Sequence, residues 1–413
     1  MSFSTAISGL TAAANMLSVT GNNVANANTT GFKESRSEFE DLYANNFANV
    51  TATTPGSGVR IVNDAQLFHQ GTLDYTNNTL DLGVNGDGFF VLGQSINNTN
   101  AQVYSRNGTF HANQDGLVIN NDNQPLMVYA PNGNDISAGF STKLQTLQVN
   151  TVSGSPQATS TISQAFNLNS SSTPPTTTTF SPTDSTSYNW SNSVTIYDSL
   201  GNSHALTSYF VKTSTAGSWS MYSAIDGTQL TTPAQPVAVS FDQNGKLSAP
   251  AAPLAISYTI PSSNAAALNI SMDMAGSTQL AANSYVSNVS QNGLPPGNLT
   301  GISIDKAGIV SANYSNGATK PLGQVALARF QNNQGLQKIG DTEWAQTVNS
   351  GSAIIGAAGN SGFGAINSGA LEQSNVDIAQ QLIKLIVAQQ SYQANAQSIT
   401  TENQAIQSIL NIR

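Results

Sequence analysis

The sequence predicts an α+β protein, in which two terminal helices form an antiparallel, coiled-coil-like inner domain and two nested antiparallel β domains fill the middle. Two observations predict this class. Apolar residues recur with a period of seven at both ends of the chain, which marks helices that pack along a partner helix. Between the ends, short strand-like runs alternate with Asn-Gly and Asp-Gly turn dipeptides, which are typical of antiparallel hairpins.

The first apolar repeat lies in residues 1–30 and predicts a helix. Its members follow steps of four and three, interrupted only by Gly21: Phe3, Ile7, Leu10, Ala14, Leu17 and Val24. The Gly- and Asn-rich run 21–28 then ends the helix, because both residue types tolerate left-handed backbone. Since Ala and Gly occupy much of the stripe, a helix that only faces a local core fits this repeat equally well.

A second, longer repeat runs through residues 370–413. Its members are Ile378, Leu382, Leu385, Gln389, Tyr392, Ala396, Ile399, Asn403, Ile406 and Leu410. The unbroken pattern exceeds the roughly 8 to 20 residues of a typical globular helix, which favours an extended partner. The polar Gln389 and Asn403 are interpreted as register-setting positions, which lower stability and raise pairing specificity.

The pairing of the two ends predicts a protein that assembles with other copies through its terminal helices. The middle of the chain would then form a separate body between the two paired ends. We predict that the larger side chains of both stripes form the interface between subunits. These residues are Phe3, Ile7, Leu10, Leu17, Val24, Ile378, Leu382, Leu385, Tyr392, Ile399, Ile406 and Leu410.

A connecting segment is expected at 31–70. Charges and aromatic residues appear together at 32–43, which suggests a second short amphipathic segment. The Thr/Gly/Pro stretch at 51–58 has the composition of a linker.

An inner β domain is predicted from residues 71–147 together with 285–369. Strand-like runs occur at 89–92, 102–104 and 117–119, and turn dipeptides at 87–88, 107–108, 115–116 and 132–133 separate them. Further strand-like runs lie at 302–304 and 325–330. The Gly/Ser-rich stretch 350–369 is interpreted as the link to the last helix.

An outer β domain, residues 148–284, is predicted as an insertion into the inner one. It contains a low-complexity Ser/Thr/Pro patch at 170–186 and alternating runs at 194–197, 206–211, 237–241 and 254–260. Alternation of this kind indicates antiparallel strands with one solvated face. The Gly- and Pro-rich run 292–297 breaks any regular element and indicates the second boundary.

Composition disfavours a nucleic-acid partner. The chain has 413 residues, of which only 8% are charged, against about 25% in ordinary soluble domains. Ser, Thr, Asn and Gln therefore supply much of the polar surface. The formal net charge of -9 is the wrong sign for the basic face that nucleic-acid binding needs.

Cysteine is absent, which excludes disulfides and thiolate sites. No apolar stretch reaches the roughly 18 residues of a membrane span, so we expect no membrane insertion. The first charge is Lys33 and the apolar residues before it are spaced rather than continuous. The N-terminus therefore does not have the pattern of a secretory signal peptide, and export, if it occurs, is expected by another route.

Catalytic, metal and cofactor sites are not predicted. His69, His111 and His204 lie in separate segments without Cys or carboxylate neighbours at metal-ligand spacing. No G-x-S-x-G elbow presents a serine nucleophile. The Gly-Asp-Gly run at 86–88 lacks the third glycine of a dinucleotide-binding turn and precedes a strand-like run.

Several of these segments resemble the bacterial flagellar rod and hook proteins. The N-terminal signature comprises Ser8-Gly9-Leu10, Gly21-Asn22-Asn23-Val24-Ala25-Asn26 and Thr30-Gly31-Phe32-Lys33. The C-terminal signature comprises Ser368-Gly369-Ala370-Leu371-Glu372-Gln373-Ser374-Asn375-Val376-Asp377, Ala388-Gln389-Gln390-Ser391-Tyr392-Gln393-Ala394-Asn395-Ala396-Gln397 and the final Arg413. The runs 86–90 and 104–108 are similar to the shared β domain of that family.

Within that family, the chain length and the run 197–212 favour the hook type over the shorter rod type. The resemblance covers the ends and the inner β domain well, and residues 150–190 and 215–285 poorly. Two positions depart from the family pattern, because Gln390 stands where Arg is frequent and Asn403 where Asp is frequent. Any ion pair made at those positions elsewhere in the family is in doubt here.

The resemblance implies a structural subunit without enzymatic activity, exported through the flagellar type III apparatus without a cleaved signal peptide. It would self-assemble into the curved tubular hook outside the cell, a universal joint that transmits motor torque from rod to filament. Implied partners are further copies of itself and the rod, hook-cap and hook-filament junction proteins. Two alternatives remain open: a distal rod protein, and a secreted Ser/Thr-rich β adhesin, which the paired terminal repeats disfavour.

Overall fold

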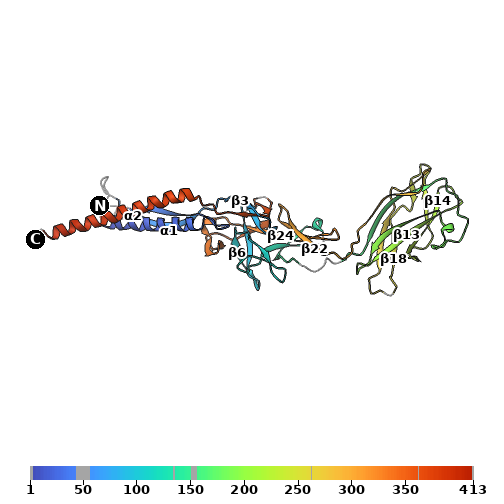
Figure 1. Cartoon of the computed structure of the whole chain (residues 1–413), viewed down its shortest axis with the longest axis horizontal. Helices are drawn as coiled ribbons and strands as arrows, with labels where there is room; N and C mark the ends of the chain where they lie inside the picture. Colours follow the sequence, from blue (N-terminus) through green and yellow to red (C-terminus); the bar gives the residue numbers. More distant parts are fainter. Residues whose placement is uncertain are drawn as a thin grey trace. The chain divides into compact units, whose positions relative to one another are not determined.

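The computed structural model describes residues 3–42, 56–133, 135–149, 156–261, 263–360 and 362–411. The chain forms two compact units, coloured along the sequence in Figure 1. The first unit comprises Met1–Asn150, Ile302–Ala312 and Thr319–Arg413, and the second comprises Thr151–Gly301 and Asn313–Ala318. The expected outer domain, 148–284, lies in the second unit apart from 148–150.

The two terminal helices pack along each other, as the repeats predict. They are α1 (Phe3–Ala25) and α2 (Ile378–Leu410), drawn in blue and red in Figure 1. They run antiparallel, because Asn23 near the end of α1 bonds to Gln381 near the start of α2, while Gly9 faces Asn395. Asp377 caps α2 by accepting the backbone N–H groups of Ala379 and Gln380.

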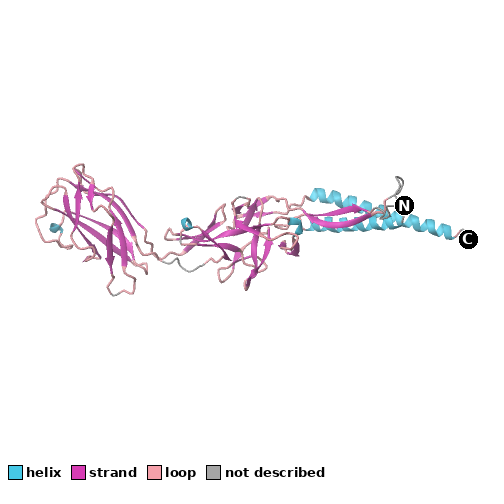
Figure 2. Ribbon diagram, turned by 180° about the vertical axis from the view of Figure 1, so that it is seen from behind, coloured by secondary structure: helices cyan, strands magenta, loops and turns pink. Residues whose placement is uncertain are grey.

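A β-hairpin lies along α1 within the expected connecting segment (Figure 2). Its strands, β1 (Ser35–Asp41) and β2 (Val59–Gln66), pair antiparallel. The amphipathic segment expected at 32–43 is therefore largely a strand. Tyr43 and residues 51–55 of the expected linker lie outside the described residues.

The body of the first unit is built mainly from one large sheet. Among the described residues it has ten strands, in the order β10-β9-β24-β5-β6-β26-β25 with β22, β23 and β27 attached. These strands are β5 (Phe89–Ser95), β6 (Asn98–Ser105), β9 (Met127–Pro131), β10 (Phe140–Thr146), β22 (Leu299–Ile304), β23 (Ile309–Tyr314), β24 (Thr319–Arg329), β25 (Gln337–Gly340), β26 (Glu343–Ala345) and β27 (Ile354–Ala357). Beside it, the rings of Phe68, Phe89, Phe330 and Trp344 pack edge to face against one another.

Two short strand pairs attach the chain just before α2 to this body. β28 (Ala365–Ser368) pairs with β4 (Leu82–Asn85), and β29 (Ala370–Glu372) with β3 (Leu73–Tyr75). A separate short pair is formed by β7 (His111–Ala112) and β8 (Val118–Ile119). The stretch 350–369 is therefore not only a link, because it contains β27 and β28. Its small residues permit close pairing: a Cβ on Gly364 would lie 2.7 Å from the carbonyl oxygen of Asn85.

The second unit is a two-layer β-sandwich in the residues described (Figure 2). One sheet has the order β18-β19-β11-β20 with β21 beside β11, and the other β12-β13-β14-β16-β17 with β15 beside β14. The strands are β11 (Thr161–Asn169), β12 (Trp190–Tyr197), β13 (Ser203–Lys212), β14 (Ser218–Ile225), β15 (Thr228–Gln229), β16 (Val237–Phe241), β17 (Leu247–Ala249), β18 (Leu254–Tyr258), β19 (Leu268–Asp273), β20 (Thr278–Leu280) and β21 (Tyr285–Gln291). Phe166, Phe210 and Trp219 lie in the core between the sheets.

The expectation of purely antiparallel β domains is wrong for one strand. β11 pairs in parallel with β19 and with β20. Parallel neighbours need a long connection between them, and the strands of the other sheet supply it. The strand-like runs in the sequence do not encode this crossover.

Candidate assembly interface

The contact between the terminal helices is made by small and polar residues. Ala6, Ala13 and Thr20 form the buried row of α1, and Gln381 and Ala388 are the buried residues of α2. Small side chains let the two backbones approach closely, and a Cβ on Gly9 would lie 2.6 Å from Oδ1 of Asn395. The predicted apolar stripe is therefore not the contact line between these two helices. That line passes one position earlier on α1, about 100° around the helix.

The predicted interface residues remain accessible in the single chain. Seven are exposed: Phe3, Ile7, Ile378, Leu382, Tyr392, Ile406 and Leu410. Five flank the contact line and are half-buried: Leu10, Leu17, Val24, Leu385 and Ile399. The helix pair therefore has an exposed apolar surface, a feature typical of interaction surfaces in soluble proteins.

Further apolar residues of α2, which the predicted stripe does not include, belong to this surface. Ile383, Ile386, Val387 and Ile409 are exposed, Ile383 by 63% and Ile409 by 69%. The signal was present in the sequence, because 383, 386 and 387 are spaced i, i+3, i+4, and 386 lies one turn after Leu382, so they widen the exposed apolar face of the helix.

The polar residues expected to set the helix register do not lie on the contact line. Gln389 and Asn403 are exposed, as is Gln390. The polar contact between the helices is instead made by Asn23, whose Nδ2 donates to Oε1 of Gln381 at 3.3 Å, with both residues buried.

A hydrogen-bonded network extends this contact to β1. Asn23 exchanges two bonds with the backbone of Ser35, at 2.7 and 2.9 Å. Nε2 of Gln381 and Nζ of Lys384 both donate to Oε1 of Glu34, at 2.7 and 2.9 Å. The helices and the hairpin are therefore joined at one end of the helix pair by directional contacts between α1, β1 and α2.

A buried ion-pair triad lies beside this network. Glu372 accepts from Nζ of Lys33 at 2.6 Å and from Nη1 of Arg106 at 3.1 Å. The same carboxylate accepts the backbone N–H of Gly71, and Nζ of Lys33 also donates to the carbonyl of His69. Burial lowers the pKa of Lys33 below its usual value, against the opposing effect of Glu372.

The triad brings together the sequence motifs that carry the family resemblance. Gly31 (φ +72°) lies against the backbone of Asn107, where a Cβ would come within 2.6 Å of the Asn107 nitrogen. Oδ1 of Asn375 accepts the N–H of Glu34, and its Nδ2 donates to the carbonyl of Leu67. We name these residues, with Lys33, Arg106 and Glu372, the junction of the first unit.

We expect Glu372→Gln to destabilise the first unit by about 3 to 5 kcal/mol, because it leaves two buried cations facing a neutral amide. Calorimetric unfolding of the variant measures this loss. Glu38→Gln is the matched control, because the Glu38–Arg36 ion pair is exposed and exposed pairs contribute little. Equal effects of the two substitutions would contradict the assigned role of the triad.

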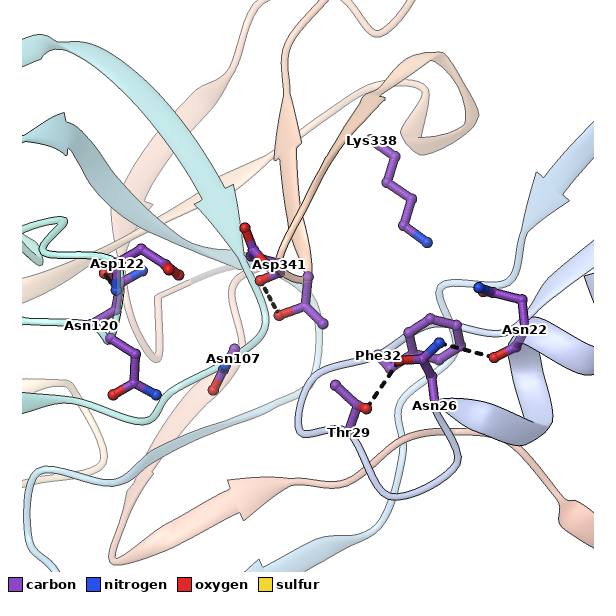
Figure 3. A pocket seen from close by; sticks show the side chains of 11 residues that line it. Asn22, Asn26, Thr29, Phe32, Asn107, Asn120, Asp122, Lys338 and Asp341 are labelled. Atoms are coloured by element: carbon purple, nitrogen blue, oxygen red, sulfur yellow. Dashed lines mark hydrogen bonds between the residues drawn. The ribbon is translucent and has the colours of Figure 1, made fainter.

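A polar cavity of about 420 Å³ opens beside the junction (Figure 3). It is lined by Asn22, Asn26, Thr29, Phe32, Asn107, Asn120, Asn121, Asp122, Lys338, Asp341 and Thr342. Nζ of Lys338 lies 5.0 Å from the ring centre of Phe32. The lining offers amide donors and acceptors together with the charged side chains of Asp122, Asp341 and Lys338.

Metal-binding clusters are not found where the structure describes the chain: no three His, Asp or Glu side chains gather at metal-binding distance. His204 nevertheless has two carboxylate neighbours, which the sequence interpretation did not identify. Its Nδ1 lies 2.6 Å from Asp226 and its Nε2 3.5 Å from Asp198. Asp226 lies on the turn after β14, 22 residues from His204 in the sequence, so no local pattern links the two.

Among the helices that the structure describes, none has the length and apolar character needed to span a membrane.

The second unit is expected to lose stability as the pH rises above neutrality. Burial lowers the pKa of His204, but hydrogen bonds to Asp226 and Asp198 outweigh it, so the pKa is raised. The contribution is therefore complete below about pH 6.5, the ordinary histidine value, and is lost as the pH rises through the raised pKa. Melting temperatures from pH 5.5 to 8.5 test this, and His204→Gln should flatten the profile. A profile that the substitution leaves unchanged would contradict the assignment.

Three family models match segments of the chain. The model described as flagella basal body rod protein matches residues 3–33, and that of the flagellar basal body rod FlgEFG protein C-terminal matches residues 367–412. The flagellar basal body protein FlaE D2 domain model matches residues 167–294. The first two contain the paired helices and parts of the junction, and the third lies in the second unit.

Relatives that are similar over their whole length are flagellar hook proteins. The chain is 36% identical to the flagellar hook protein FlgE of Salmonella typhimurium and 36% identical to that of Escherichia coli, in each case over 100% of both chains. The crystal structure of the Helicobacter pylori flagellar hook protein FlgE2 matches with a TM-score of 0.53 at 16% identity, covering 73% of this chain and 100% of that one. At this identity, the structural likeness shows the fold alone.

Proposed function

Because the chain belongs to the family of flagellar hook proteins, we propose that it is the structural subunit of the hook, a curved tube that transmits motor torque from rod to filament. One observation carries this proposal. The terminal helices pair through small residues and leave many of their large apolar side chains exposed. Contact with further copies of the same chain would bury such a surface.

The paired helices are proposed to form the inner wall of the tube. The first half of α2 has one broad exposed apolar face, on which Ile386 lies one turn from Leu382 and Ile383 lies beside them. A face of this width would let each helix pair contact more than one neighbour. A continuous wall of interlocked helices resists twisting, because each side chain is held between those of adjacent copies.

The β sheets of the first unit and the whole second unit are proposed to form the outer layers, where the tube must lengthen and shorten as it bends. With 8% charged residues, contacts between β surfaces would depend on hydroxyl and amide groups and would contain few fixed ion pairs. Such contacts can exchange partners in small steps. The junction transmits load between the two layers of one subunit through the buried triad and the network around Asn23.

The remaining roles follow from family membership. We propose that the chain is exported by the flagellar type III apparatus without a cleaved signal peptide and functions in the flagellum outside the cell. Its further partners are the rod, hook-cap and hook-filament junction proteins. We propose no enzymatic activity, cofactor, nucleic-acid partner or membrane insertion.

Electron microscopy of the polymer formed by the purified chain tests this function. Curved tubes support the hook assignment. Straight, rigid tubes would indicate the distal rod alternative, and failure to polymerise under conditions that assemble hook proteins would contradict both and favour an adhesin.

A further inference from the structure

The C-terminal part of α2 extends past its partner helix. The contacts Asn23–Gln381 and Gly9–Asn395 fix one antiparallel register, and in it Phe3, the first residue of α1, lies level with Thr401. The described part of α1 therefore ends short of Ile406. We call residues 403–410 the overhang.

The overhang carries three large exposed apolar side chains and no charge. Ile406, Ile409 and Leu410 are exposed, Leu410 by 70%, and 403–410 contain no charged residue. Ile409 continues the row of α2 that faces α1, because the row Gln381, Ala388, Asn395 and Glu402 reaches it at steps of seven. The side of α2 that α1 covers elsewhere is thus left open at this end.

A second exposed group on α2 has the same geometry. Ile383, Ile386 and Val387 are spaced i, i+3, i+4, and so are the three apolar residues of the overhang. Side chains with this spacing stand together on one helix face. Two helices that carry matching groups can interlock them as knobs and holes when they run side by side.

Resting on the proposed hook function, we propose that the overhang of one copy packs against Ile383, Ile386 and Val387 on α2 of the next copy. The contact joins two different surfaces, so it repeats along the polymer without closing. Contact between two overhangs would join identical surfaces and end in a closed dimer. An open tube therefore favours the unlike pair.

Cysteine cross-linking tests this contact directly, because the chain contains no cysteine of its own. Ile409→Cys and Ile386→Cys are combined in one chain, polymerised and oxidised. We expect a ladder of covalent multimers on a non-reducing gel. Mixing the two single variants should give dimers only, and each single variant alone should stay monomeric. Val348→Cys, at a residue 98% exposed on the body of the first unit, should not cross-link to Ile409→Cys.

Several results would overturn the proposal. Dimers from Ile409→Cys alone would show overhangs meeting each other, and cross-linking of Ile409→Cys to Phe3→Cys instead of Ile386→Cys would place α1 in the contact. If the unsubstituted chain forms tubes but the double variant does not cross-link, the hook function stands and this contact is refuted. No tubes from the unsubstituted chain would refute the hook function itself.

Removal of residues 403–413 is the second measurement, which is independent of cysteine chemistry. Because the overhang extends beyond the described part of α1, we expect the shortened chain to keep its melting temperature and lose polymerisation. Normal tubes from the shortened chain would overturn the proposal even if the cysteine variants failed to assemble.

Discussion

Leu382→Asp is expected to abolish polymerisation while leaving the fold of the single chain intact. Leu382 is 47% exposed in the chain, so the carboxylate remains hydrated before assembly. In the polymer it would be buried without a partner, at a cost on the order of several kcal/mol for each contact. Since 1.4 kcal/mol corresponds to a factor of ten, the critical concentration should rise about 100-fold or more.

Sedimentation of the polymer and circular dichroism of the monomer separate the two effects. Leu385→Asp should also prevent assembly, but Leu385 is half-buried beside the helix contact, so some loss of helix is expected as well. Val348→Asp is the control, because it places the same charge at an exposed apolar site outside the helices. Tubes of normal length from Leu382→Asp would contradict the interface assignment.

Removing the second unit is expected to give straight tubes instead of curved ones. The two chain segments that lead into its sandwich meet at Gln157 and Leu294, which exchange backbone hydrogen bonds of 3.0 and 2.8 Å. A short Gly/Ser linker in place of 158–293 can therefore join adjacent ends. The sandwich has its own core, so its removal should leave the first unit folded.

The reason is the proposed division of labour between helices and β units. In this proposal, the helices carry the contacts that hold the tube together, and the second unit supplies lateral contacts that set the curve. Electron microscopy of the shortened chain measures the outcome, with circular dichroism as the control for folding. Loss of all tubes from a folded chain would place the second unit among the contacts that hold the tube together.

The terminal helices could be predicted well from the sequence, because an apolar period of seven residues over such lengths is typical of a helix packed along a partner. Their contact line was misplaced, because counting large apolar residues selects Ile7 and Leu382, whereas the helices approach through Ala13 and Ala388. Small residues contribute little to a hydrophobic pattern, yet they allow the closest backbone approach. Large apolar residues such as Ile7 and Leu382 are therefore exposed in the single chain.

The junction was missed for a different reason. Lys33 and Glu372 lie 339 residues apart, and no local pattern links two single charges over that distance. A clue was available, since both stand inside the family motifs of a chain with few charges. The crossover that makes β11 parallel to β19 is equally non-local. The strands of the second unit could be found from alternation, but their pairing partners could not.

A three-dimensional reconstruction of the assembled tube by electron cryomicroscopy would locate each part of the subunit. We expect α1 and α2 to form the innermost layer, with Leu382 and Ile386 buried against neighbouring copies, and the strands of the first unit and the whole second unit to lie at larger radius. Helices on the outer surface of the tube, or Leu382 and Ile386 still exposed to solvent within it, would contradict the proposed inner wall.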